Sequence, residues 1–412
     1  MKRRVVVTGI GSVSPFGAGF DPLWAAVREG RSAVKPITTW DVSEYPTRIA
    51  AEIVDVDLSD YMDPKVAKRS DPYTQFAVAA SEIALTDASF EVNDDNAARV
   101  GVIIGSGIGG MRTWEEQFER LLAKGPGRIS PFFVPMMIVN MGSGMVSMVT
   151  GAKGPNLTVA TACATSTHAI GDAMQIIRRG DADAMIAGGS ESAITKCALA
   201  GFCRAGALSR RNDEPEKACR PFDVDRDGFV MGEGATVMVL EELENAKARG
   251  ADIYCEVAGY GASGDAHHMT DPDPSGDGPK RAMQAALSDA VLAAADVDYI
   301  NAHAPGTPAG DKMEATAIRS LFGDLADETP VSSTKSIHGH QLGATGATEF
   351  AMCAMAIRES YIPASVNSDN IDPECRVNVV QGEAIETDVA VTMSNSFGFG
   401  GHNGVLVGRR VD

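Results

Sequence analysis

Short runs of apolar residues alternate along most of the chain with longer amphipathic or alanine-rich segments. The longer segments predict helices at 71–87 and 165–179, and the short runs predict strands at 3–8, 100–105, 157–160, 182–187 and 235–241. The run at 157–160 is expected to be buried. Strands separated by helices are typical of folds in which helices cover both faces of a sheet. The pattern therefore predicts an α/β protein.

The second half of the chain repeats the order of elements in the first half. Residues 5–11 resemble residues 255–261, and residues 84–88 resemble residues 286–290. We therefore predict a duplicated α/β unit with an N-terminal half at 1–250 and a C-terminal half at 251–412. The segment 106–151 has no counterpart in the second half and is predicted to be an insertion.

Charge and cysteine content narrow the function classes. The 412 residues carry a formal net charge of −19, which argues against a nucleic-acid partner because phosphate binding needs a basic face. The seven cysteines are an odd number and do not indicate a secreted disulfide framework, so a reducing, cytoplasmic location is expected. No apolar run approaches the roughly 18 residues that a membrane span needs, so no membrane association is expected.

Two motifs suggest functions that their surroundings do not support. Residues 105–110 fit the G-x-G-x-x-G pattern of dinucleotide loops, so a nucleotide-dependent oxidoreductase is kept as an alternative from another class. In a dinucleotide-binding unit this loop and its helix should be followed by a second strand with an acidic residue about 20 residues on, and the sequence does not continue in that way. Residues 223–228 open like a calcium loop, but Gly234 stands where the bidentate glutamate belongs. No zinc-ligand spacing occurs, and no metal site is expected from these motifs.

The most informative cysteine is Cys163. A β-branched run leads into it and an amphipathic helix follows, so Cys163 is expected at a strand-to-helix turn. The positive end of a helix lowers a thiol pKa and favours a nucleophilic thiolate. The alternative is a buried structural thiol, which is the interpretation we give to four other cysteines, namely Cys197, Cys203, Cys255 and Cys353.

Two histidines occupy comparable loop positions in the second half. His303 follows a predicted strand at 298–302, and His340 precedes a predicted helix at 345–358. Strand ends in α/β sheets are where sites form, so these histidines are candidates to join Cys163. Near the C-terminus, residues 394–404 place glycines among aromatic residues, and a backbone amide there could face an oxyanion.

Together these segments resemble the β-ketoacyl-acyl-carrier-protein synthases, most closely the type II elongation enzymes. The motifs that carry the resemblance are Thr161-Ala162-Cys163, Asn301-Ala302-His303, residues 335–340 and residues 395–401, in that order. The resemblance implies a thiolase-like fold, with duplicated βαβαβαββ halves in a layered α-β-α-β-α sandwich, and a homodimer. It also implies decarboxylative Claisen condensation of an acyl-enzyme with malonyl-acyl-carrier-protein, as in fatty-acid elongation.

The resemblance also implies roles for individual residues. Catalysis would involve Cys163, His303, His340, Lys335, Glu349 and Phe399, with Phe399 also acting as a gate. The substrate would contact Ile108, Phe133 from the partner subunit, Thr307, Phe397 and Gly398. The acyl carrier protein would dock on Lys65, Lys68, Arg69 and Arg204. No cofactor is implied, although some relatives hold a monovalent cation near Asn301, Glu349 and Asn395.

The chain departs from the family pattern after His303. Ala304-Pro305-Gly306 replaces the usual Gly-Thr-Ser, so one hydroxyl expected to bind the pantetheine arm is lost at Pro305, while Thr307 remains. A weaker grip on the arm or a shifted loop is expected. This departure keeps a second hypothesis open, a ketosynthase of a polyketide or other specialised acyl pathway. A thiolase is disfavoured, since His340 stands where thiolases typically have a second cysteine.

Overall fold

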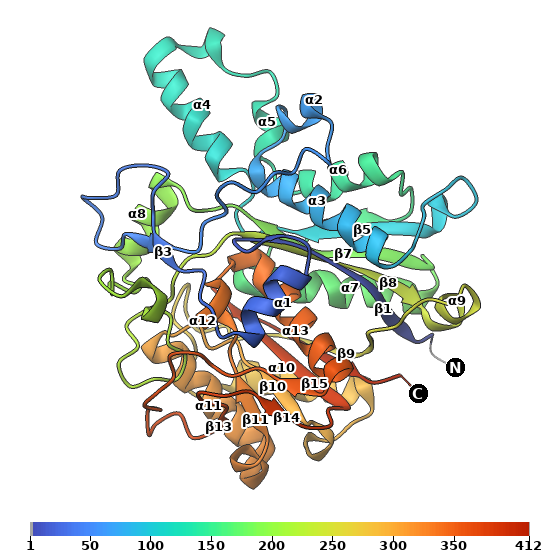
Figure 1. Ribbon diagram of the computed structural model, residues 1–412, viewed down its shortest axis with the longest axis vertical. Helices are drawn as coiled ribbons and strands as arrows, with labels where there is room; N and C mark the ends of the chain where they lie inside the picture. The colour runs from blue at the N-terminus through green and yellow to red at the C-terminus, as the bar shows by residue number, and fades with distance from the viewer. Residues whose placement is uncertain (1–2, 412) are drawn as a thin grey trace.

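The computed structural model describes residues 3–411. Its main sheet has two parts with the same order of strands (Figure 1). In the first part, β6 (Asn156–Leu157), β5 (Val100–Gly105), β7 (Ala184–Glu191), β8 (Gly234–Glu242) and β1 (Val5–Ser14) lie side by side. In the second part, the order is β11 (Pro330–Ser332), β10 (Tyr299–Asn301), β15 (Val391–Gly398), β16 (His402–Arg409) and β9 (Cys255–Gly264). Each part therefore places its third, second, fourth, fifth and first strands in that order.

The two parts meet where β1 pairs with β9 in antiparallel fashion, at Val6–Glu256 and Val7–Cys255. Two short strands extend the sheet, namely β2 (Gly17–Ala18) beside β1 and β13 (Asn378–Val379) beside β11. Two separate two-stranded sheets are formed by β3 (Lys35–Pro36) with β4 (Ile49–Ala50) and by β12 (Tyr361–Ile362) with β14 (Ile385–Glu386).

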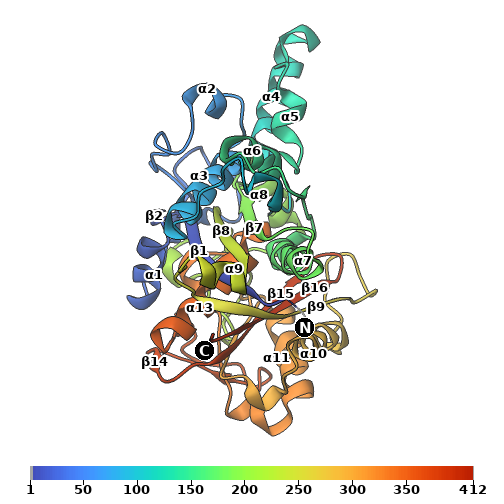
Figure 2. The same ribbon diagram turned by 90° about the vertical axis from the view of Figure 1, so that its right-hand side faces the viewer.

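Helices cover the sheet in layers, as Figure 2 shows. The outer face of the first part is covered by α3 (Pro72–Asp87), and that of the second part by α10 (Asp277–Ala290) and α11 (Pro308–Phe322). Between the two parts lie α7 (Thr165–Arg179) and α13 (Thr345–Glu359), which pack against each other. All ten residues of β1 are buried, because helices cover both faces of this strand. The layers confirm the expected α-β-α-β-α arrangement.

Close packing of sheet and helix explains the repeated sequence motif. A Cβ atom on Gly11 of β1 would lie 2.0 Å from the Ala80 oxygen of α3, and one on Gly261 of β9 would lie 2.0 Å from the Ala282 oxygen of α10. Both strands need glycine where the following helix crosses them. The resemblance between residues 5–11 and 255–261 is therefore a packing requirement that is met twice.

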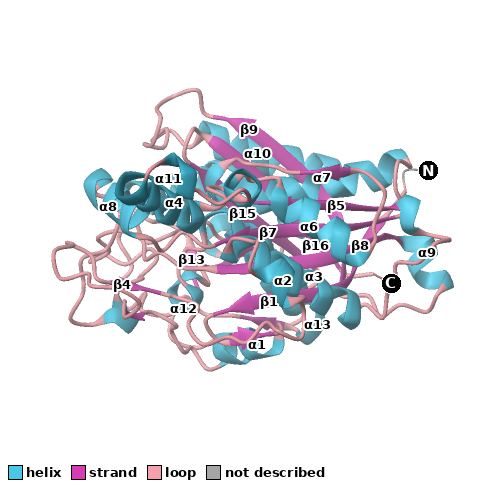
Figure 3. Cartoon of the chain, turned by 90° about the horizontal axis from the view of Figure 1, so that it is seen from above, coloured by secondary structure: helices cyan, strands magenta, loops and turns pink. Residues whose placement is uncertain are grey.

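The remaining helices belong to the insertion or are short. The segment 106–151 holds α4 (Met111–Lys124), α5 (Phe133–Met137) and α6 (Met141–Thr150), of which α4 projects from the body in Figures 1 and 2. The others are α1 (Asp21–Arg28), α2 (Pro64–Ala67), α8 (Lys196–Ala205), α9 (Leu243–Ala248) and α12 (Lys335–His338). Seen from above, α8 and α9 lie at opposite ends of the molecule and α1 lies along one side (Figure 3). None of the described helices is long and apolar enough to cross a membrane.

Two local expectations were wrong. The predicted buried strand at 157–160 is only the two-residue β6, and Leu157 is 52% exposed, because β6 forms the open edge of the sheet. Cys197 is exposed rather than buried. It lies in the first turn of α8, where its backbone N–H donates to Glu115 at 2.6 Å.

Candidate active site

Cys163 lies in a tight turn at the N-terminus of α7. The residue before it, Ala162, has a φ of +49°, a strained value for a residue with a Cβ. The Thr165 hydroxyl holds this turn by donating to the Ala162 oxygen at 2.7 Å and accepting from the Thr161 N–H at 2.8 Å. An equivalent turn precedes α13, where Leu342 has a φ of +48°. The two halves therefore present matching turns toward one site.

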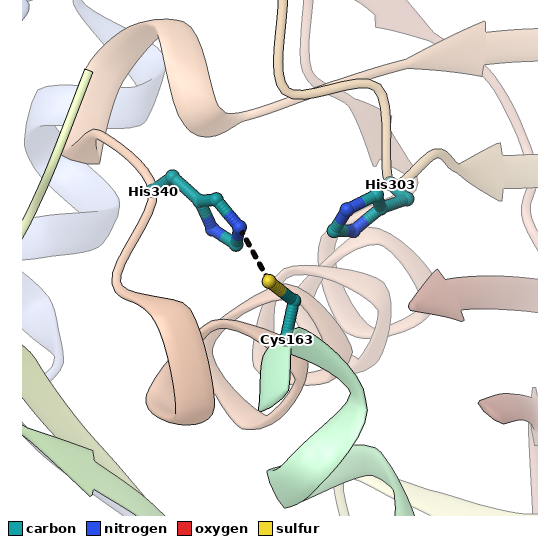
Figure 4. Close-up of side chains that lie close together, drawn as sticks. All are labelled: Cys163, His303 and His340. Carbon is teal, nitrogen blue, oxygen red and sulfur yellow. Dashed lines mark hydrogen bonds between the residues drawn. The ribbon is translucent and has the colours of Figure 1, made fainter. Parts of the chain in front are cut away.

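The two histidines meet Cys163 from the second half, as Figure 4 shows. His340 Nε2 lies 3.0 Å from Cys163 Sγ, and His340 Nδ1 lies 3.0 Å from the Thr345 hydroxyl. The His303 and His340 rings meet edge to face, with centroids 5.4 Å apart. One sulfur and two imidazole nitrogens lie within 4.8 Å of one another. The structure thus brings together the three residues that the sequence analysis singled out.

Burial controls the protonation of all three groups. It raises the pKa of the Cys163 thiol to about 12, against the smaller lowering effect of the Lys335 ammonium. Burial and the same ammonium lower the pKa values of His303 and His340 well below the usual range. The expectation of a standing thiolate was therefore wrong, because desolvation of the closed turn outweighs the helix end. The resting site holds a thiol beside two neutral imidazoles.

Two backbone amides face the sulfur. The N–H groups of Phe399 and of Cys163 itself both lower the pKa of the thiol, since they donate toward Sγ. Gly398 makes this approach possible, because a Cβ on it would lie 2.9 Å from the Cys163 nitrogen and 2.8 Å from the Thr161 oxygen. Such a pair of amides can stabilise an oxyanion formed on a carbonyl bound to the sulfur.

A buried ion pair supports the histidine loop. Lys335 Nζ donates to Glu349 Oε1 at 2.5 Å and also to the His303 carbonyl oxygen, and both side chains are fully buried. Burial raises the pKa of Glu349 to about 8 even though the Lys335 ammonium lies beside it. Glu314 accepts the N–H groups of His303 at 2.9 Å and of Ala304 at 2.6 Å. The backbone at His303 is thus fixed by a cation and a carboxylate.

Several buried oxygen atoms beside this pair have no hydrogen-bond partner within residues 3–411. They are Asn301 Oδ1, Glu349 Oε2, Ser394 Oγ and Asn395 Oδ1. Asn301 and Ser394 are neighbours across the parallel pair β10 and β15, against which α13 packs with Glu349. Oxygen atoms from carboxylate and amide groups are ligands for a hard cation. The donor set therefore fits the cation that the family resemblance implies.

A cavity of about 240 Å³ opens beside the trio. Four of the five expected substrate residues line it, namely Ile108, Thr307, Phe397 and Gly398, and Phe399 also lines it. Aromatic contacts run from Phe399 through Phe202 and Phe229 to His340, with ring centroids 5.1–6.5 Å apart. Phe133 lies on α5, away from the cavity of its own chain.

The four expected docking residues are exposed. Lys65, Lys68 and Arg69 lie on and directly after α2, and Arg204 lies in the last turn of α8. Within residues 3–411, none of these side chains is in an ion pair, and the Arg69 guanidinium stacks on the Phe132 ring at 4.5 Å. They are therefore available to an acidic partner.

The comparisons with known proteins agree with this geometry. The model of the β-ketoacyl synthase N-terminal domain matches residues 2–246, and that of the C-terminal domain matches residues 254–369. The chain belongs to the β-ketoacyl synthase family. It is 52% identical over 410 residues to 3-oxoacyl-[acyl-carrier-protein] synthase 2 of Coxiella burnetii, with 100% of this chain and 99% of the relative covered. The enzyme of the same name from Staphylococcus aureus strain N315 is 50% identical with the same coverage.

Solved ketosynthase structures share the whole fold. A β-ketoacyl synthase from Burkholderia phymatum STM815 superposes with a TM-score of 0.93 at 38% identity, covering 100% of both chains. A type II polyketide ketosynthase in complex with its acyl carrier protein gives the same score and coverage at 32% identity. The thiolase-like fold that the resemblance implied is therefore confirmed for this β-ketoacyl synthase.

One positioning residue of this β-ketoacyl synthase escaped the sequence analysis. Glu191, buried at the end of β7, accepts the N–H groups of Gly107 at 2.8 Å, Ile108 at 3.2 Å and Gly343 at 3.0 Å, and the Ser106 hydroxyl at 2.8 Å. It joins the cavity loop of the first half to the turn after His340. In a dinucleotide-binding protein, backbone N–H groups of a loop such as 105–110 would bind phosphate. Here the N–H groups of Gly107 and Ile108 donate to the Glu191 carboxylate instead.

The calcium-like segment is also explained by internal contacts. Arg226 is buried and donates to Asp372 at 2.8 Å and to the oxygens of Thr307 at 3.1 Å and Pro308 at 2.8 Å. Arg226 thus anchors the loop that carries Thr307, while Asp223 of the same turn pairs with Arg220 at 3.0 Å.

Proposed function

We propose that the protein is a 3-oxoacyl-acyl-carrier-protein synthase that elongates fatty acids by decarboxylative condensation. The contact of Cys163 with His340, with His303 beside both, carries this proposal. Full-length relatives at 50–52% identity bear the name of such a synthase, whereas the type II polyketide ketosynthase is 32% identical. The specialised pathway is therefore the less supported alternative.

The first half-reaction loads the acyl group on Cys163. The sulfur attacks the thioester carbonyl of the acyl carrier, the carbon–sulfur bond to the carrier breaks, and the thiol proton ends on the released carrier thiol. The amides of Cys163 and Phe399 stabilise the oxyanion of the tetrahedral intermediate. Because burial keeps the thiol neutral, negative charge develops on sulfur only during attack.

The second half-reaction forms the carbon–carbon bond. Malonyl-acyl-carrier-protein loses CO₂, and the electron pair of the broken bond moves into an enolate whose oxygen accepts hydrogen bonds from His303 and His340. The enolate carbon attacks the acyl carbonyl on Cys163, the carbon–sulfur bond to Cys163 breaks, and the departing thiolate takes up a proton from water, which restores the thiol as the β-ketoacyl product forms. Lys335 and Glu349 position the loop of His303 and do not touch the substrate.

A monovalent cation would be held by Asn301 Oδ1, Glu349 Oε2 and Asn395 Oδ1, none of which has a hydrogen-bond partner among the described residues. It would supply positive charge beside Glu349 and so favour the ionised carboxylate that pairs with Lys335. The residues of the chain perform the condensation itself.

The pantetheine arm would enter past Pro305 and Thr307, which both line the cavity. The Thr307 oxygen accepts the Gly310 N–H at 3.2 Å, which leaves its O–H free to donate to the arm. Pro305 offers neither a hydroxyl nor an N–H, so the arm has one hydroxyl partner here. Acidic carrier proteins would be held mainly by Lys65, Lys68, Arg69 and Arg204.

A homodimer is part of the proposal. Exposed apolar side chains concentrate in the segment 106–157, where Leu122 is 72%, Met148 64%, Val134 56% and Leu157 52% exposed. The open edge at β6 lies in the same segment, and a second copy would cover both. The partner's insertion would then bring Phe133 to the cavity. All seven cysteines are free, which supports a reducing compartment such as the cytoplasm.

The decisive experiment is reconstitution with acyl- and malonyl-loaded carrier protein. Mass spectrometry should show the acyl mass on the peptide that contains Cys163, followed by its loss and a β-ketoacyl carrier two carbons longer when the malonyl carrier is added. Cys163→Ala should abolish acylation. Acylation elsewhere, or a hydrolysed acyl group without a longer product, would contradict the proposed function.

A further inference from the structure

The Thr345 hydroxyl has one partner in the described part of the chain. Its oxygen lies 3.0 Å from His340 Nδ1, and the side chain is fully buried at the first position of α13. The opposite ring nitrogen, Nε2, faces Cys163 Sγ at 3.0 Å. Thr345 therefore contacts the ring on the side away from the reaction.

The direction of this hydrogen bond follows from what the hydroxyl can reach. A buried hydroxyl donates its proton wherever an acceptor is available. If the imidazole Nδ1 carried the proton and donated it to Thr345, the threonine O–H would have no acceptor among residues 3–411. If the hydroxyl donates instead, both groups are satisfied and the single proton of the neutral ring lies on Nε2.

The equivalent threonine of the first half behaves differently. Thr165 occupies the first position of α7, but its hydroxyl both donates to Ala162 and accepts from Thr161, so it serves the backbone alone. His303 provides the second contrast. Its Nδ1 is buried without a hydrogen-bond partner in the described part of the chain, so no described neighbour fixes its tautomer there. Of the two histidines, only His340 is held by a side chain at Nδ1.

We propose that Thr345 is a positioning residue that keeps His340 in the tautomer with its proton on Nε2, aimed at the sulfur and at the substrate oxygen. This inference rests on the proposed function for its catalytic consequence. His340 is then a fixed hydrogen-bond donor to the developing enolate and to the sulfur, and it does not remove the thiol proton. His303 donates to the same enolate oxygen, but no residue within 3–411 fixes its tautomer at Nδ1.

The tautomer can be measured without substrate. Protein labelled with ¹⁵N in histidine gives distinct nitrogen shifts for protonated and unprotonated ring positions, and His340 is assigned by comparison with His340→Asn. We expect Nε2 protonated and Nδ1 unprotonated in the wild type. In Thr345→Val, which removes the hydroxyl at nearly constant shape, the Nδ1 signal should move to the position of a nitrogen without a hydrogen bond. Thr345→Ser should restore the wild-type shift.

Kinetics supply the second readout. The condensation rate, measured from preformed acyl-enzyme, should fall about tenfold in Thr345→Val and recover in Thr345→Ser. The KM for the malonyl carrier should change by less than about twofold. A matched control is Thr348→Val, one turn later in α13, whose hydroxyl donates to Gln341 at 2.7 Å; its His340 shifts should stay at the wild-type position.

Three outcomes would overturn the proposal. They are a wild-type spectrum with Nδ1 protonated, a Thr345→Val spectrum and rate equal to wild type, or a Thr345→Ser variant as slow as Thr345→Val. Failure of the proposed function is recognised separately, because the expected spectra would then appear in a protein that makes no β-ketoacyl carrier.

Discussion

Cys163 Sγ and His340 Nε2 lie 3.0 Å apart although 177 residues separate them in the chain. Each belongs to the turn that precedes a central helix, Cys163 before α7 and His340 before α13. Because these helices pack against each other between the two parts of the sheet, duplication of one unit places the two turns face to face. A thiol sulfur from one half of the chain is thus paired with an imidazole from the other half.

The first prediction concerns the pH dependence of Cys163. With a thiol pKa of about 12, the rate of alkylation by iodoacetamide should rise about tenfold per unit between pH 6.5 and 9, without a plateau. The rate is measured by loss of the unmodified Cys163 peptide. A plateau below pH 8 would instead indicate a standing thiolate stabilised by the helix end.

The second prediction is that Gly398→Ala slows acylation of Cys163. Its new Cβ would lie 2.8 Å from the Thr161 oxygen and 2.9 Å from the Cys163 nitrogen, so the amide of Phe399 must move away from the sulfur. Acylation of Cys163 should fall by about 10²–10³-fold, the usual effect of losing one oxyanion donor. Gly201→Ala on α8, where the Cβ meets nothing within 4 Å, is the control and should acylate normally. Equal rates for both variants would exclude Phe399 from the oxyanion hole.

The residues of this site could be predicted where they stand in local sequence motifs, and not where their role depends on contacts with distant parts of the chain. The bounds of α7 follow from its periodicity and from Gly180 after Arg179, and Cys163, His303 and His340 stand in ordered local motifs. The protonation of Cys163 could not be predicted, because its burial depends on loops of the second half. Glu191 left no local signal either, since three of its four partners are backbone N–H groups that any sequence would supply. The matching turn at Thr345, by contrast, could have been found by aligning the two halves.

Breaking the buried ion pair should destabilise the fold more than removing it whole. Lys335→Met leaves Glu349 buried without its cation, and the free energy of unfolding should fall by about 3–5 kcal/mol. The double variant Lys335→Met, Glu349→Met should recover part of that loss, since no unpaired charge remains. Urea unfolding of both variants measures the difference. A double variant less stable than the single one would show that the pair itself is favourable.

Acid should destabilise the protein through His338, which does not belong to the trio. Burial and the Lys335 ammonium lower the pKa of His338 to about 3. Between pH 6.5 and 3 the unfolded chain binds a proton there that the folded chain does not, so stability is lost as pH falls. Relative to His338→Gln, the wild type should lose about 2 kcal/mol of unfolding free energy between pH 7.5 and 5. Other titrating groups cancel in this difference, and a difference independent of pH would contradict the shift.

The last prediction concerns the contact with the carrier protein, because this chain has a formal net charge of −19. An acidic carrier must overcome repulsion through a local basic patch, and Lys65 and Lys68 are exposed on and directly after α2. Lys65→Glu, Lys68→Glu should raise the KM for carrier substrates at least tenfold and leave small acyl thioesters within about twofold. Added salt should weaken carrier binding by the wild type more than by the variant, because only the wild type has the attraction to screen.

The double variant Lys247→Glu, Lys312→Glu, with two exposed lysines elsewhere, makes the same charge change and serves as control. An equal loss in both variants would attribute the effect to net charge alone, and an equal loss on small thioesters would remove the docking role.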